Sequence, residues 1–232
     1  MARSGWAAPA HRANSPRVAS DHPERDLALS YAVAGRAAAA AIFALDDRLA
    51  AVVRAARDPL IGQMRLTWWH DALSALDDAP APAEPLLQAL AREALPCGVS
   101  GAAMAPIAAG WEALLERPLD AEAVARHGDR GRALFAALGQ AIGAAGDPLD
   151  NAGAGWALAD LSRHVTDPGA AQIAAAQAAP LLDRALAARW SRRGRALGAL
   201  AHLARLDIER PGIKPGAPRR VLRMLRHRLT GR

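Results

Sequence analysis

The sequence has very few of the residues that build disulfides, zinc clusters or strands: one cysteine, one tyrosine and two phenylalanines among 232 residues. Cys97 has no partner for an internal disulfide and cannot supply a thiolate cluster, which fits a reducing compartment. No stretch is apolar enough to span a bilayer, because the longest uncharged one, 94–111, is rich in alanine and broken by proline and glycine. The first 25 residues are charged and contain no apolar run, so no secretory signal is predicted.

Alanine, by contrast, is abundant, with 61 residues. It is the strongest helix former, whereas the scarce aromatic residues favour strands. Apolar residues make up 52% and charged residues 22% of the chain, which is typical of a folded globular protein, and the length fits one domain. The predicted fold class is therefore all-α.

Apolar residues recur every three or four positions between Arg25 and Arg57, which predicts one helix or two. Asp58-Pro59 is a typical helix start, and it predicts a helix to about Leu76. Further helices are expected over 84–94, 102–116, 120–127, 131–145, 152–165, 170–205 with a break near Pro180, and 218–229. No fixed-period repeat occurs, so we expect a compact bundle over residues 25–232 preceded by a loose tail, residues 1–24.

The sequence contains no glycine-rich phosphate loop, no HExxH motif and no GxSxG motif. Its distinctive segment is DPLIGQMRLTWWHDAL, residues 58–73. Adjacent tryptophans on a helix point about 100° apart. One of Trp68 and Trp69 is therefore expected to pack between helices and the other to line a cavity or partner surface, unless both are core residues.

This segment resembles the signature of the squalene/phytoene synthase family. The matching residues are Pro59, Gly62, Arg65, Trp68, Trp69 and Asp71. Residues 40–45 are similar to the family's first pocket helix, 155–163 to the helix that carries its second acidic motif, and 218–232 to its closing helix. The resemblance covers residues 25–232 and implies an isoprenoid synthase-type helical bundle around a central apolar pocket for prenyl chains.

Joining two prenyl diphosphates requires Mg²⁺, and Mg²⁺ requires carboxylates, which the family supplies as aspartates four residues apart on two facing helices. Here Asp46 and Asp47 are followed four positions later by alanines, and the second motif places His164 and Pro168 at its acidic positions. No residue is therefore assigned a catalytic role and no metal site is predicted. The candidate pocket or diphosphate-binding residues are Asp46, Asp47, Arg65, Asp71, Asp160, Arg163 and His164.

These candidates leave alternatives open. Asp160 and His164 are four residues apart and could form half of a metal site or a simple surface contact. Arg65 and Arg163 could bind a phosphate group through bidentate hydrogen bonds, or they could form ordinary ion pairs. Asp71 could equally bind Mg²⁺ or pair with an arginine.

The loss of aspartates from both acidic motifs implies a non-catalytic protein. In this respect the chain is similar to the branch of the family that contains the mitochondrial complex I assembly factors. The resemblance predicts binding of an isoprenoid lipid or of a respiratory-complex subunit, with no cofactor, in the cytoplasm and peripherally on the inner membrane. The alternative is a Mg²⁺-dependent prenyl-diphosphate transferase with unusual metal ligands, an enzyme of terpenoid biosynthesis.

Charge is distributed unevenly along the chain: residues 184–232 carry a net charge of +12, and residues 1–183 carry −6. In the C-terminal segment a stripe formed by Val221, Leu222, Leu225 and Leu229 is accompanied by arginines. These candidate lipid-surface residues are Arg219, Arg220, Arg223, Arg226 and Arg228. The helix could lie on an anionic membrane, or its leucines could pack on their own domain. Nucleic-acid binding is not predicted, because the sequence contains no helix-turn-helix or RNP motif.

Overall fold

A computed structural model describes residues 22–232, and every regular element in that part of the chain is a helix, as predicted. The α-helices are α1 (Pro23–Leu29), α2 (Arg36–Ala55), α3 (Pro59–Ser74), α4 (Pro85–Glu93), α5 (Gly101–Glu112), α6 (Ala121–Ile142), α7 (Leu149–His164), α8 (Pro168–Ala187), α9 (Arg195–Glu209) and α10 (Pro218–Thr230). Three short 3₁₀ helices, η1 (Ala75–Asp77), η2 (Leu95–Cys97) and η3 (Ala113–Leu115), extend or link them.

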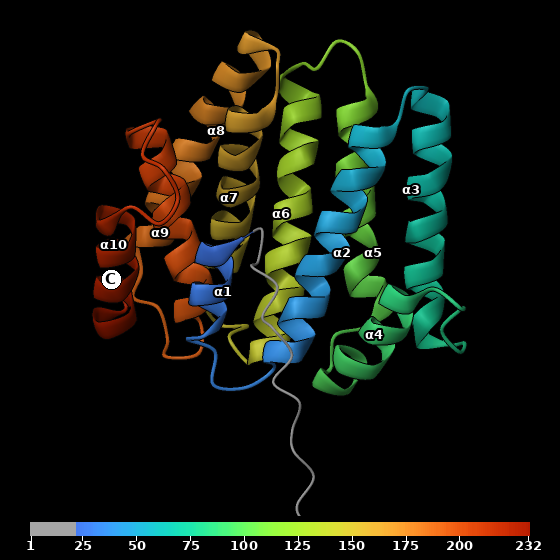
Figure 1. Ribbon diagram of the computed structural model, residues 1–232, viewed down its shortest axis with the longest axis horizontal. Helices are drawn as coiled ribbons and strands as arrows, with labels where there is room; N and C mark the ends of the chain where they lie inside the picture. The colour runs from blue at the N-terminus through green and yellow to red at the C-terminus, as the bar shows by residue number, and fades with distance from the viewer. Residues whose placement is uncertain (1–21) are drawn as a thin grey trace, which may run out of the picture.

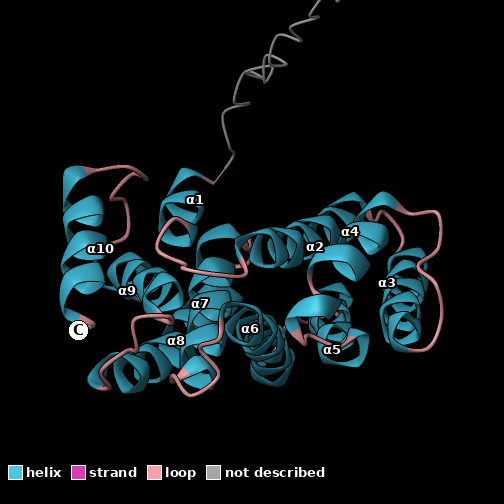
Figure 2. Ribbon diagram, turned by 90° about the horizontal axis from the view of Figure 1, so that it is seen from below, coloured by secondary structure: helices cyan, strands magenta, loops and turns pink. Residues whose placement is uncertain are grey.

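The helices form an elongated bundle with α6 and α7 at its centre (Figure 1). Helices α8, α9 and α10 follow towards one end, with α1 beside α9, while α2, α5, α4 and α3 lie towards the other end (Figure 2). Helices α3 and α10 are therefore the outermost elements, at opposite ends of the molecule. This arrangement separates the signature segment on α3 from the arginine-rich C-terminal helix.

The predicted helix over residues 25–57 is present as two, α1 and α2. The chain turns between them at Gly35, whose φ of 66° lies in the left-handed region. A Cβ at this position would lie 2.0 Å from the carbonyl oxygen of Ala141. Only glycine fits this turn, so Gly35 ends the connection from α1 and begins α2.

Two predicted breaks were wrong. Residues 120–127 and 131–145 belong to one helix, α6, because Gly128 and Gly131 lie against α7 and allow close packing instead of ending the helix. The segment 170–205 is two helices, but they separate at residues 188–194 and not near Pro180, which lies inside α8. Packing against neighbouring helices here overrides local helix propensity.

Most of the predicted N-terminal tail, residues 1–21, lies outside the described part of the chain, whereas Pro23 and Glu24 already belong to α1. Between residues 22 and 232 no helix combines the length and hydropathy needed to cross a bilayer. The core consists largely of alanine and leucine, with a few large side chains such as Phe43, Phe135 and Trp190.

Candidate functional site

A buried ion pair lies between α2, α5 and α6. Asp46, on the inner face of α2, accepts a hydrogen bond of 2.8 Å from the indole Nε1–H of Trp111 on α5. The same carboxylate oxygen lies 3.4 Å from Nη1 of Arg130 on α6. All three side chains are nearly inaccessible to solvent, and that of Arg130 is only 1% exposed. The pairing keeps a buried carboxylate and a buried guanidinium from being left uncompensated.

The guanidinium of Arg130 is enclosed by aromatic rings. Its Cζ lies 4.2 Å from the ring centroid of Trp111 and 5.2 Å from that of Trp156. Its Nε and Nη2 atoms are buried and have no hydrogen-bond partner among the described residues. The π faces of the two tryptophans therefore provide part of the stabilisation that water would otherwise give to the cation.

Close contact between α5 and α6 positions this arginine. A Cβ on Gly110 would lie 2.5 Å from the Cβ of Arg130, so the two helices meet at this glycine. One turn earlier on α6, Nδ1 of His127 lies 3.1 Å from the carbonyl oxygen of Gly110. Burial, and then the charge of Arg130, lower the pKa of His127 to about 3, so the imidazole is neutral. A neutral ring can donate its Nδ1–H to that carbonyl.

A second acidic position faces this group from α7. Asp160 and His164 contact each other, with 3.1 Å between Asp160 Oδ1 and His164 Nδ1. Burial raises the pKa of Asp160, but the hydrogen bond with His164 and the charge of Arg130 together outweigh it, so the pKa is lowered. The hydrogen bond with Asp160 likewise raises the pKa of His164. The predicted pair therefore exists, at the C-terminal end of α7.

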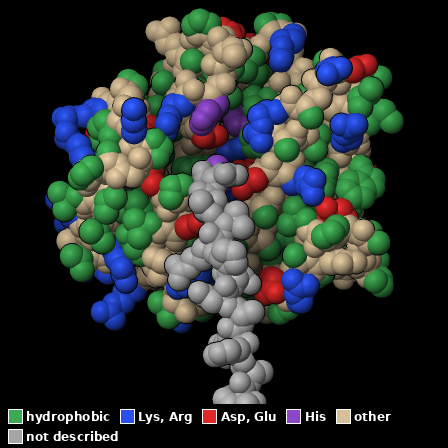
Figure 3. Space-filling view, in the orientation of Figure 1, with side chains coloured by type: hydrophobic (Ala, Val, Ile, Leu, Met, Phe, Trp, Pro, Cys, Tyr) green, Lys and Arg blue, Asp and Glu red, His purple; other side chains and the backbone are tan. Residues whose placement is uncertain are grey.

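Electrostatic interactions connect the two acidic positions through Arg130. Burial raises the pKa of Asp46, against the opposing effects of Arg130 and Trp111, and the negative charges of Asp160 and Asp47 raise it further. The positive charge of Arg130 stabilises both carboxylates. Figure 3 shows a hollow near the middle of this face of the molecule, with histidine and acidic side chains at its edge.

Asp47, the neighbour of Asp46, points in a different direction. Its carboxylate lies 3.0 Å from Nη2 of Arg25 on α1 and 3.6 Å from Nε2 of His22, and it is about half exposed. Arg25 also lies over the ring of Phe43, with 4.7 Å between Cζ and the ring centroid. Adjacent positions on a helix diverge by about 100°, and only Asp46 reaches the interior.

The signature residues organise α3. The side chain of Asp58 caps the helix by accepting a hydrogen bond of 2.9 Å from the backbone N–H of Leu60, and Pro59 occupies the first turn. A Cβ on Gly62 would lie 2.9 Å from that of Ala56, so this glycine allows α3 to pack closely. Trp69 is buried whereas Trp68 is 48% exposed, which confirms that the two tryptophans point in different directions.

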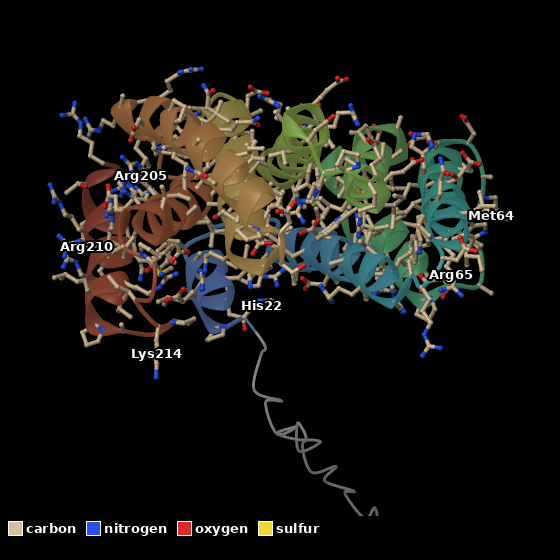
Figure 4. The ribbon with its side chains drawn as sticks, turned by 90° about the horizontal axis from the view of Figure 1, so that it is seen from above. His22, Met64, Arg65, Arg205, Arg210 and Lys214 are labelled. Carbon is tan, nitrogen blue, oxygen red and sulfur yellow. The ribbon has the colours of Figure 1, made fainter. Side chains whose placement is uncertain are left out.

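Three candidates lie away from the Asp46–Arg130 pair. Arg65 is exposed on α3 and lies with Met64 at that end of the molecule (Figure 4). Asp71 is exposed and lies 3.3 Å from Nδ1 of the adjacent His70. Arg163 forms an ion pair of 2.7 Å with Asp207 of α9. Arg65 and Arg163 therefore do not lie close enough together to bind the same phosphate group.

Of the candidate lipid-surface arginines, Arg220 points inward. Its guanidinium is buried and pairs with Glu24 of α1, 2.7 Å away, and with Asp207 of α9. Arg223 pairs with Glu209 at 3.1 Å. Arg220 therefore holds α10 against the bundle, because a buried cation with two carboxylate partners cannot also reach a lipid surface.

The carboxylates do not fit a magnesium site of the kind the family requires. The carboxylate of Asp46 is buried and paired with Arg130 and Trp111, and that of Asp47 is paired with Arg25. The positions four residues after each are alanines. Between residues 22 and 232 no group of three or more His, Cys, Asp or Glu side chains is arranged to hold a metal ion.

Sequence reasoning missed Arg130, Trp111 and His127. A signal for two of them exists in α6, where Ala123, His127, Arg130, Leu134 and Ala137 alternate at spacings of four and three residues. That spacing places Arg130 on the buried stripe. Because two separate helices were predicted around Gly128 and Gly131, the continuous stripe was not recognised from the sequence.

Comparisons of the chain with protein-family models, with curated proteins and with solved structures found no match.

Proposed function

We propose that this protein is a non-catalytic relative of the squalene/phytoene synthases that acts by binding a partner, either a respiratory-complex subunit or an isoprenoid lipid. The observation that carries the proposal is the position of Arg130. It gives Asp46 a fixed cationic partner, and its charge also acts on Asp160, the carboxylate four residues before His164. An allylic diphosphate ionises only when cations neutralise the leaving group, and here the carboxylates that would hold such cations face an arginine.

The outer face of α3 supports a protein partner. Leu60, Ile61, Met64 and Trp68 are all about half exposed or more, and their spacing places them on one side of the helix. Exposed apolar residues that gather on one helix face are typical of a protein-docking surface. A role in assembling a respiratory complex, in the cytoplasm at the inner membrane, is the form of the proposal that this face favours.

An isoprenoid ligand is favoured by the aromatic residues beside Arg130. The ring centroid of Trp156, which is partly exposed, lies 6.3 Å from that of Phe43 and 5.7 Å from that of Phe135. Aromatic rings of this kind line apolar ligand pockets. The isoprenoid synthase-type architecture and a central apolar pocket remain part of this proposal.

Pyrophosphate release separates this proposal from the transferase alternative. Folded protein incubated with Mg²⁺ and farnesyl or geranylgeranyl diphosphate is expected to release no more pyrophosphate than Asp71→Ala and Asp160→Ala variants. Mg²⁺-dependent release by the unaltered chain that both substitutions abolish would establish a transferase with rebuilt metal ligands and overturn the proposal.

The nature of the partner is tested on α3. A Met64→Arg/Trp68→Ala variant is expected to lose co-purification with an identified respiratory-complex subunit from the membranes of the source organism. Val33→Ala, which changes an exposed apolar residue outside α3, serves as the matched control. Quenching of tryptophan fluorescence by farnesol, unchanged in the α3 variant, would instead identify the isoprenoid as the ligand.

A further inference from the structure

Helix α10 packs on the bundle through an inner face that contains none of its leucines. Its buried residues are Arg220, Met224 and His227, spaced by four and three positions along one side of the helix. Arg220 is fixed by Glu24 and Asp207, and the ring of His227 lies 4.6 Å from that of His202 on α9 and 6.1 Å from that of Trp190. The expectation that the leucines pack on their own domain is therefore not met.

The leucines of α10 face solvent instead. Leu222, Leu225 and Leu229 are 68%, 39% and 78% exposed, and their spacing of three and four residues forms one stripe. Helix α10 is the outermost helix at its end of the molecule, so no other helix of the described chain covers this stripe (Figures 1 and 2). Burying a leucine side chain contributes about 1.5–3 kcal/mol, which makes an exposed row of three a strong site for an apolar partner.

Two arginines beside this stripe carry uncompensated charge. Arg219 and Arg226 are exposed and form no ion pair with any described residue, and on a helical projection they lie next to Leu222. Arg210 and Lys214 lie at the same end of the molecule (Figure 4). The outer side of this end is therefore apolar along the leucines and positive beside them.

We propose that the outer face of α10 binds the surface of an anionic membrane. The leucines would enter the boundary between headgroups and acyl chains, with the helix lying in the plane of the interface, while Arg219 and Arg226 contact lipid phosphates. Charge complementarity selects this partner, because an apolar stripe bordered by arginines matches an interface that is apolar below and anionic above. An RNA would use the arginines but leave the leucines in water.

The inference stands apart from the proposed function, since it concerns the opposite end of the molecule from α3 and no residue beside Arg130. Its test is sedimentation of the full chain with vesicles of phosphatidylcholine alone and of phosphatidylcholine with roughly 30% phosphatidylglycerol. The chain is expected to sediment with the anionic vesicles, to be released by high salt, and to bind the neutral vesicles at least tenfold more weakly.

Two variants resolve the apolar and the electrostatic contributions. Leu222→Ser/Leu229→Ser and Arg219→Glu/Arg226→Glu are each expected to lower binding to the anionic vesicles more than tenfold. The matched controls on the far side of the molecule are Leu60→Ser/Met64→Ser, which changes equally exposed apolar residues, and Arg57→Glu/Arg65→Glu, which changes the net charge equally. Both controls are expected to bind as the unaltered chain does.

Circular dichroism confirms that each variant is folded, which is expected because all the altered side chains are exposed. Three results would overturn the proposal: no sedimentation with anionic vesicles, equal losses in the control variants, or loss in the arginine variant only. The last result would identify a general attraction of a basic protein to anions, such as RNA, that does not involve the leucines.

Discussion

Gly131 on α6 and Gly153 on α7 face each other across the centre of the bundle. A Cβ on Gly131 would lie 2.0 Å from the carbonyl oxygen of Gly153, and a Cβ on Gly153 would lie 2.1 Å from that of Gly131. The obstacle in each case is backbone, which cannot rotate away as a side chain can. Arg130 on α6 and Asp160 on α7, two residues of the candidate site, are therefore held in place by a contact between helices that no larger residue permits.

Gly131→Ala is expected to destabilise the fold, because the new methyl group would force α6 and α7 apart. Overpacking of this kind lowers the free energy of unfolding by about 1–3 kcal/mol or more. We expect a loss at the upper end of this range, because the new methyl group would meet backbone atoms. Urea unfolding followed by circular dichroism measures the effect. Gly146→Ala is the control, because a Cβ there meets nothing within 4 Å, and it should leave the midpoint unchanged or slightly raised. Equal behaviour of the two variants would contradict the packing argument.

Asp46→Asn is expected to destabilise the chain by about 3–5 kcal/mol, because it leaves the buried Arg130 without an anionic partner. Replacing both members in Asp46→Asn/Arg130→Met should recover much of that loss, since no buried charge then remains. Urea unfolding of the two single variants and the double variant gives the coupling energy. Asp47→Asn, next in sequence but half exposed, should cost no more than about 1 kcal/mol. Additive single and double effects would show that the pair is not coupled.

The fold class could be predicted from the sequence because alanine content, helical spacing and the helix-start signal at Asp58-Pro59 all agreed. The boundaries that failed, at Gly128, Gly131 and Pro180, are positions where packing between helices decides. The sequence alone does not show whether a glycine ends a helix or lies inside one. At Gly131 the answer comes from the packing, because the carbonyl of Gly153 on α7 lies where a side chain would otherwise be.

The candidate site was predictable only in part, for a similar reason. Asp46 and His164 could be chosen because they stand where the acidic motifs of the family are expected, and Asp160 because it lies four residues before His164. Asp160 and His164 do contact each other on α7, and the charge of Asp160 acts on Asp46 of α2. Arg130 has no such counterpart, and its role depends on α5 and α6 meeting at Gly110. Asp71 and Arg65 share the signature segment, yet α3 lies at the edge of the bundle, so proximity in sequence did not bring them to the buried pair.

Arg220→Met is expected to loosen α10, because it removes the buried cation that joins α10 to Glu24 of α1 and Asp207 of α9. Amide hydrogen exchange should accelerate in α10 and α1 while α3 remains unchanged. Arg220→Lys should rescue this only partly, since an ammonium cannot reproduce the planar contacts with both carboxylates. Arg219→Met, on the exposed side of the same helix, is the matched control. Exchange in α10 that is equally slow in both variants would exclude this role for Arg220.

Acidification is expected to destabilise the interface between α9 and α10. Burial lowers the pKa of His227 to about 4 and that of His202 to about 3. Nearby cationic groups act in the same direction: Arg195 on His227, and His227, then Arg223 and Arg226, on His202. Asp147 opposes the shift at His227. In the unfolded chain a histidine takes up its proton near pH 6.5. Below that pH the unfolded state therefore binds more protons than the folded state, and stability falls as the pH falls.

The magnitude follows from the difference between the two states. A histidine that stays neutral in the fold costs about 2 kcal/mol of stability between pH 7 and pH 5. This interval lies above the range in which carboxylates such as Glu24, whose pKa is lowered in the fold, begin to lose their stabilising charge. His164 acts in the opposite sense, because its raised pKa stabilises the fold at low pH, but its exposure keeps that effect small.

Urea unfolding at pH 7, 6 and 5 measures the dependence. The free energy of unfolding of the unaltered chain should fall steadily over this interval. That of His227→Gln should fall less, because glutamine takes up no proton in the unfolded chain. His70→Gln, which removes an exposed histidine on α3, is the control and should retain the dependence of the unaltered chain. If the pH dependence is the same in His227→Gln as in the unaltered chain, protonation of His227 does not destabilise the folded state, and the prediction is wrong.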